Sequence, residues 1–147
     1  MASINTNPIK SESDVKTYLA GLKYALDHGS KVSFKKERRV DEKRNPKFTN
    51  KHTMATLFPD ENPVEVLKRE LPLLSSENYL RTIEDIKFPD RPEWWEFGKV
   101  YNETDEVYIK IRVCLLDGSG AGTHTTFVMS FHFAERPFSE EIFPYKK

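Results

Sequence analysis

The sequence predicts a two-layer α+β domain in which a small antiparallel sheet is covered on one face by N-terminal helices. Two patterns support this fold class. Apolar residues in the N-terminal half repeat with the period of a helix, whereas those from residue 94 onward alternate with the period of a strand. A chain of 147 residues has the length of one domain. We therefore expect a single domain, 1–147, with a helical, basic half at 1–74 and a sheet-forming half at 75–147.

The helical half should hold one long helix and several shorter ones. The long helix is predicted at about 12–28, between a candidate N-cap at Ser11 and a natural stop at Gly29. Shorter helical segments are expected at 52–58, from Asn62-Pro63 to Pro72, and in a turn that carries Tyr79. The apolar stripe of the long helix has the 3.6-residue period and consists of Val15, Tyr18, Leu19, Leu22 and Leu26.

The sheet-forming half should hold three consecutive strands, at 94–101, 106–116 and 126–135, joined as an antiparallel meander. The glycine-rich stretch 117–124 is interpreted as a hairpin connection. On the second strand the apolar side chains that should face the helix with Leu19 and Leu22 are Val107, Ile109, Ile111 and Val113, opposite Tyr108, Lys110, Arg112 and Cys114. On the third strand alternation places Phe127, Met129, Phe131 and Phe133 on one side and Val128, Ser130, His132 and Ala134 on the other.

Composition excludes several classes of protein. Lys and Arg number 23 and Asp and Glu number 23, so the chain is neither polybasic nor an acidic tail protein. The sequence shows no transmembrane stretch and no secretory signal, and its single cysteine cannot form an intramolecular disulfide. These features lead us to expect a cytoplasmic protein. The four histidines lack ligand spacing and the common cofactor motifs are missing, so we expect no metal and no cofactor.

Net neutrality conceals a basic segment. Between Lys31 and Lys51 there are nine basic residues against three acidic ones. Such a segment can bind phosphate groups along a nucleic acid, with Lys35, Lys36, Arg38 and Arg39 as candidate contacts. The alternative is a solvated, mobile loop with no ligand.

The polar sides of the last two strands carry the residues best suited to chemistry. Tyr108 and Lys110 lie two apart on one strand, as do Ser130 and His132 on the next, so all four are candidate catalytic residues on one concave, solvent-reachable surface. Cleavage of RNA without a metal needs a base for the 2′-OH proton, an acid for the leaving oxygen and cations for the phosphate. His132 is the candidate acid or base, because its ordinary pKa lies near neutrality. The cations that could bind RNA around these four residues are Arg81, Lys99 and Arg112.

A plainer interpretation exists for the same residues. Tyr, Lys, Arg and Ser are all common on an exposed sheet face, and His132 lies between two phenylalanines, as a hydrogen-bonded core residue could.

Four short segments in this order resemble the MqsR-type toxins of type II toxin–antitoxin modules. They are ENYLRT (77–82), WWEFGKV (94–100), EVYIKIRV (106–113) and MSFHFAE (129–135), and the resemblance covers roughly 60–138. Tyr108 matches the active-site tyrosine of that family. The chain differs from the family where His132 stands at a lysine position, Glu96 at a glutamine position, and Leu80, followed by Arg81, at a second lysine position.

The resemblance implies a RelE/MqsR-like fold and the function of a toxin. The implied activity is that of a hydrolase, a metal-free mRNA endoribonuclease that arrests growth and is neutralised by a cognate antitoxin protein. The alternative is a non-catalytic module of phage or mobile-element origin that binds a protein or a nucleic acid, since basic and aromatic surfaces bind RNA without cutting it.

Overall fold

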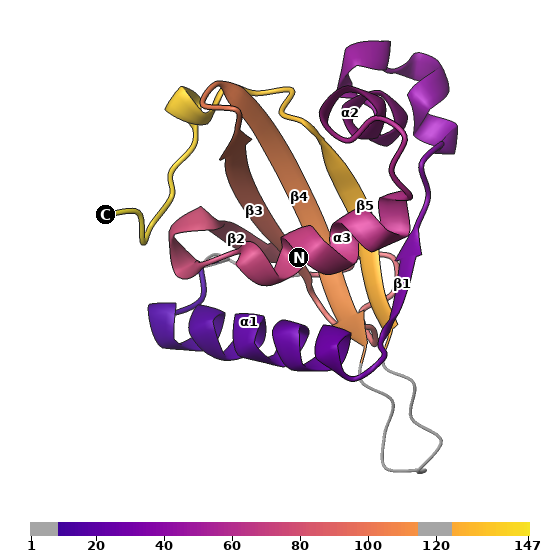
Figure 1. Cartoon of the computed structure of the whole chain (residues 1–147). Coiled ribbons are helices and arrows are strands. Elements are labelled where there is room, and N and C mark those ends of the chain that lie inside the picture. The colour runs from indigo at the N-terminus through magenta and orange to yellow at the C-terminus, as the bar shows by residue number, and fades with distance from the viewer. Residues whose placement is uncertain (1–8, 115–124) are drawn as a thin grey trace.

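A five-stranded mixed sheet organises the part of the chain that the computed structural model describes, residues 9–114 and 125–147 (Figure 1). The strands lie in the order β1-β5-β4-β3-β2; β1 is parallel to β5 and every other pair is antiparallel. Their bounds are β1 Lys31–Phe34, β2 Tyr79–Ile83, β3 Trp94–Tyr101, β4 Asp105–Cys114 and β5 Thr125–Phe133. The α-helices of these residues are α1 Glu12–Asp27, α2 Asn50–Leu57 and α3 Pro63–Glu70.

The predicted helices form, with small changes of bounds. Ser11 caps α1, since its hydroxyl oxygen accepts a hydrogen bond from the amide of Asp14 at 3.1 Å. The helix ends before Gly29, whose φ of +82° is the left-handed conformation that favours glycine. Asn62 caps α3 and Pro63 occupies its first turn. The turn expected at Tyr79 forms as a short 3-10 helix over Ser76–Asn78, with Ser75 as its N-cap and Tyr79 as its C-cap, and Tyr79 then begins β2.

The helices cover one face of the sheet, and the core lies between the two layers (Figure 1). Ile109 and Ile111 of β4 are at most 1% exposed, and they share a cluster with Leu22 of α1 and Leu67 of α3. The predicted apolar side of β4 is therefore confirmed. Tyr18 ties the layers together, because its ring stacks on Trp95 at 3.8 Å between ring centroids and its hydroxyl accepts a hydrogen bond from the Val113 amide.

The sheet is larger than the predicted meander and is not purely antiparallel. The central strands β3, β4 and β5 lie where they were predicted, and β2 and β1 extend the sheet at its two edges. The basic segment at 31–51 is thus not one loop, since it begins with β1, contains a 3-10 helix at Arg39–Lys43 and ends in α2. The predicted end of the second strand at 116 and the connection at 117–124 lie outside the described residues.

A β-bulge in β5 overturns part of the predicted alternation. Lys110 lies opposite Ser130, but Ile111 lies opposite Val128, so Met129 is an extra residue in β5. Val128 consequently joins the core opposite Ile111, whereas Phe127 lies opposite Arg112 on the other face. Simple alternation had placed Val128 and Phe127 the other way round.

Helix α2 stabilises the bulge. Strand β1 pairs with β5 only as far as Val128, and the side chain of Asn50 takes over beyond that point. Its amide nitrogen donates to the carbonyl oxygens of Met129 (3.1 Å) and Lys35 (3.0 Å), and its oxygen accepts from the amide of Phe131 (3.0 Å). Asn50 is 1% exposed, so these bonds are shielded from water.

Among residues 9–114 and 125–147, no helix combines the length and the apolar character that crossing a lipid bilayer requires.

Candidate functional site

The candidate site lies on the side of the sheet opposite the helices, which we call the polar face. Cross-strand pairing builds it in two neighbouring rows. One row runs across four strands through Arg81, Glu96, Lys110 and Ser130, and the other runs through Gly98, Tyr108 and His132. The four predicted catalytic residues therefore share one face, as their spacing indicated. The bulge at Met129 precedes Ser130 in the chain, so Ser130 and His132 pair with β4 in regular register.

Tyr108 and His132 meet directly. Their ring centroids are 5.4 Å apart, and both side chains line a cavity of about 220 Å³. The rest of the lining comes from the segment after β5 and consists of Ala134, Glu135, Arg136, Phe138 and Glu141. The predicted concave surface thus exists around this pair, although His132 is only 4% exposed.

The hydrogen bonding of His132 defines its proton-accepting atom. Nδ1 lies 2.9 Å from the carbonyl oxygen of Phe133, and a carbonyl can only accept, so Nδ1 carries a proton. Burial lowers the pKa of His132, and the guanidinium groups of Arg44 and Arg38 lower it further, whereas the bond to Phe133 and the carboxylate of Glu135 oppose that shift. The imidazole is therefore neutral at neutral pH, and its Nε2 is a free base.

Tyr108 keeps its proton. Burial and the neighbouring carboxylate of Glu96 raise the pKa of the phenol well above its ordinary value, because both disfavour the phenolate. The phenol is placed to hydrogen-bond Glu96, whose carboxylate also accepts from Arg81 Nη1 at 2.5 Å. Glu96, which the sequence marked only as a departure from a family pattern, is thus a central, 5% exposed member of the site.

Two arginines of the polar face are held by carboxylates. Arg81 binds Glu96 on one side and Glu141 on the other, each at 2.5 Å. Arg112 donates to Asp85 at 2.9 Å, and its guanidinium lies 4.0 Å from the ring centroid of Trp94. Both cations lie on the predicted face, but their charge is largely satisfied within the protein.

Lys110 and Arg38 differ from Arg81 and Arg112, because no carboxylate of the described residues holds them. Within the described residues neither side chain forms an ion pair, although both are half-buried. Burial lowers the pKa of each, and for Lys110 the charge of Arg38 adds to that effect while Glu96 opposes it. Arg38 is the one member of the four predicted basic contacts that turns toward the polar face, where it interacts electrostatically with Tyr108, Lys110 and His132.

Four predicted cations are not part of this cluster. Lys99 lies on the helix-covered side of the sheet, with its ammonium nitrogen 5.4 Å from the ring centroid of Tyr101, so it was wrong to place Lys99 at the rim of the site. Lys35, Lys36 and Arg39 are exposed near the edge of the sheet.

Ser130 also differs from the prediction of a solvent-reachable residue. It lies on the polar face, but it is only 3% exposed and is therefore buried.

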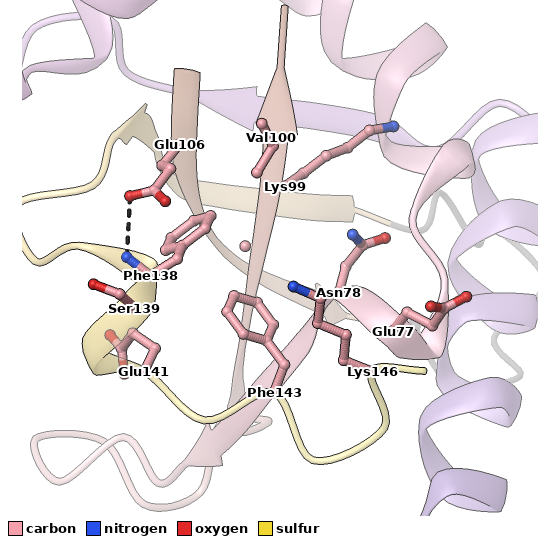
Figure 2. Close-up of a pocket in the computed structure, with 11 residues that line it drawn as sticks. Glu77, Asn78, Lys99, Val100, Glu106, Phe138, Ser139, Glu141, Phe143 and Lys146 are labelled. Carbon is pink, nitrogen blue, oxygen red and sulfur yellow. Dashed lines mark hydrogen bonds between the residues drawn. The ribbon is translucent and has the colours of Figure 1, made fainter. Parts of the chain in front are cut away.

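The C-terminal segment is the part of the site that the sequence did not reveal. The first part of this segment, which spans residues 134–147, crosses the polar face, where Phe138 and Phe143 lie over Gly98, which bears no side chain (Figure 2), and its end returns to the core, where Tyr145 stacks on Tyr79. The amide of Phe138 donates to Glu106 Oε1 at 3.0 Å. A groove of about 560 Å³ lies there between β3 and the segment. Phe138, Phe143 and Tyr145 were the available signal, because large aromatic side chains are usually buried against other parts of a fold.

No group of three or more His, Cys, Asp or Glu side chains in the described residues is arranged to hold a metal ion. Comparison of the chain with models of protein families, with curated proteins and with solved structures finds no match. Its function must therefore be argued from the chemistry of the polar face.

Proposed function

We propose that this chain is the toxin of a type II toxin–antitoxin pair and acts as a metal-free mRNA endoribonuclease, with its active centre at the Tyr108–His132 cavity. The observation that carries the proposal is the contact between a neutral imidazole and a protonated phenol inside one cavity. The partner implied by the sequence resemblance, a cognate antitoxin protein, belongs to the same proposal.

His132 acts first in the proposed reaction. Its Nε2 takes the proton of a ribose 2′-hydroxyl, and the 2′-oxygen attacks the neighbouring phosphorus atom. The bond from phosphorus to the 5′-oxygen breaks, and the imidazolium returns the proton to that oxygen. The products are a 2′,3′-cyclic phosphate and a 5′-hydroxyl, so atoms and protons balance.

Tyr108 and the cations have supporting roles. The Tyr108 phenol orients the ribose or stacks on a base, since it keeps its proton at neutral pH. Lys110 lies in the next row of the polar face and stabilises the negative charge that grows on the phosphate oxygens. Arg81 is less suited to this task because two carboxylates already bind it.

The test is cleavage of a labelled single-stranded RNA by the purified protein in the presence of EDTA. We expect His132→Asn to lower the cleavage rate by about 10²–10⁴-fold, because the amide replaces the Nδ1 donor but supplies no base. His52→Ala is the matched control, since His52 is exposed on α2 and lies outside the polar face. In cells, the wild-type chain should arrest growth and the adjacent gene product should rescue it.

Two results would reject the proposal. A folded His132→Asn protein with full cleavage activity would remove the catalytic role of the imidazole. Activity that disappears in EDTA and returns with Mg²⁺ would reject the metal-free reaction.

The second candidate function is a binding module without catalysis. It is favoured by the pairing of Arg81 and Arg112 with carboxylates and by the small exposure of His132. This function predicts that cells tolerate the wild-type chain and that the purified protein binds RNA or a protein without cleaving RNA.

A further inference from the structure

We propose that Arg38 and Lys110 form a binding site for a phosphate group on the polar face, next to the Tyr108–His132 cavity. The site deepens the proposed function, because it names where a phosphate of the RNA backbone binds. Its test needs no cleavage, so the two proposals can fail separately.

The first argument is that neither cation has a carboxylate partner among the described residues; the ammonium of Lys110 lies against the ring of Trp94, 5.6 Å from its centroid. In the described part of the chain, no carboxylate lies within ion-pair distance of Lys110 or Arg38, whereas Arg81, Arg112 and Arg44 all have one. Half-buried cations lose hydration, and proteins ordinarily compensate with a paired anion. Two such cations that interact electrostatically and have no paired anion among the described residues indicate a site for an anion supplied from outside.

The second argument is the position of the carboxylates near the two cations. Asp41 acts on Arg38, but its Oδ2 accepts from the Arg38 backbone amide at 2.8 Å and its Oδ1 lies 3.9 Å from Arg44 Nη1. Glu96 is the acidic group with the strongest effect on Lys110, yet it already accepts from Arg81 and is placed to accept from Tyr108. Asp85 is held by Arg112, and its carboxylate also accepts two backbone amide hydrogens from Lys87 and Phe88. Neither Glu96 nor Asp85 can turn to Lys110 without breaking those bonds.

The third argument concerns the ligand. The two cations come from different segments, β4 and the turn after β1, so they can contact a compact anion from two directions. Ser130, opposite Lys110 in the pairing of β4 with β5, adds a hydroxyl that could donate a hydrogen bond. A tetrahedral phosphate suits these three groups, since a guanidinium, an ammonium and a hydroxyl are all donors to its oxygens.

The experiment uses inorganic phosphate and a single-stranded 2′-O-methyl RNA, in which the attacking 2′-oxygen is blocked. Binding is measured by thermal unfolding for phosphate and by fluorescence anisotropy for the RNA. Arg38→Met and Lys110→Met keep most of the side-chain volume and remove the charge. We expect each to raise the dissociation constant for both ligands by about tenfold or more, because a hydrogen bond to a charged group is lost.

Lys23→Met is the control, because Lys23 is an exposed residue of α1 on the helix-covered side. The unliganded proteins provide a second readout. Removing an unpaired, half-buried charge should raise the melting temperature of Arg38→Met and Lys110→Met without phosphate, whereas loss of a purely structural contact would lower it.

The result that overturns the site is an equal response to phosphate and to the RNA in the wild type, both polar-face variants and the control. Binding of RNA but not of inorganic phosphate, with both variants impaired, identifies the ligand as a nucleic-acid backbone. If Lys110→Met does not fold, Arg38→Met alone decides the outcome. Impaired binding in the variants of a protein that never cleaves RNA supports the site and rejects the nuclease.

Discussion

Phe138 and Phe143 of the C-terminal segment lie over Gly98 on the polar face, and the substitution Gly98→Ala tests that contact. A Cβ atom at Gly98 would lie 2.7 Å from Phe138 Cζ and 2.9 Å from Phe143 Cζ. Favourable contacts between carbon atoms are about 3.5–4.0 Å long, so both rings would have to move.

The expected cost follows from two opposing effects. Overpacking of this kind costs about 1–3 kcal/mol, and replacing glycine by alanine in a strand returns about 0.5–1 kcal/mol. We therefore expect Gly98→Ala to lower the free energy of unfolding by about 1–2 kcal/mol, measured by urea denaturation. Hydrogen exchange of the backbone amides should become faster in residues 136–145, because Phe138 and Phe143 no longer pack closely against β3.

Gly21→Ala is the matched control for this substitution. Gly21 is exposed in α1, and a Cβ atom there meets nothing within 4 Å. Alanine at this position should raise stability by about 0.5–1 kcal/mol, since it favours the helix. The reasoning would be refuted if Gly98→Ala were as stable as the parent protein and left hydrogen exchange in the C-terminal segment unchanged.

Three further outcomes are expected. Asn50→Ala should lower the free energy of unfolding by about 3 kcal/mol in urea, because the buried amide of Phe131 and the part-buried carbonyl oxygens of Met129 and Lys35 lose their partner; a loss below about 1 kcal/mol would contradict its role at the bulge. Acidification from pH 7.5 to 5.5 should destabilise the protein, since the unfolded state binds a proton at His132 more readily than the folded state, and His132→Asn should show a smaller fall in its urea midpoint. If about three cations of the basic segment contact RNA, log K should fall with log salt at a slope of roughly −2, and Ala at the exposed residues Lys35, Lys36 and Arg39 should flatten it; an unchanged slope and affinity would leave a solvated segment.

The central sheet and the main helices could be predicted because their patterns are local. Burial of one side of β4 requires alternate apolar residues, and that pattern is complete from Val107 to Val113. The bulge at Met129 could not be predicted in this way. It depends on hydrogen bonds from Asn50, which lies 79 residues earlier and belongs to helix α2.

The two edge strands were missed for related reasons. β1 has only four residues, of which Lys31 and Ser33 are exposed, so its sequence differs little from that of a polar loop. It forms a strand because Thr125–Val128 offers a parallel edge to pair with. In β2, a bulge between Tyr79 and Arg81 places Tyr79 and Thr82 on the same buried side, and Leu80 is buried as well, so the alternation that would identify a strand is broken.

The candidate site shows the same division between local and distant information. Strand spacing was sufficient to place Tyr108, Lys110, Ser130 and His132 on one face, since that arrangement follows from alternation and from the pairing of β4 with β5. It was not sufficient to show which cations remain free to bind an anion, because that depends on carboxylates elsewhere in the chain.

Arg81 and Lys110 show that a positive charge alone does not make a residue available to bind an anion. Both are cations in the same row of the polar face, and both flank Glu96 in the sheet. Arg81 is bound by Glu96, 15 residues later, and by Glu141, 60 residues later, so a phosphate at Arg81 must displace a carboxylate. Among the described residues no carboxylate forms an ion pair with Lys110, whose ammonium lies 5.6 Å from the ring centroid of Trp94, so a phosphate at Lys110 displaces no anion. Whatever anion this face binds should therefore depend on Lys110 and Arg38 more than on Arg81, which two carboxylates already bind.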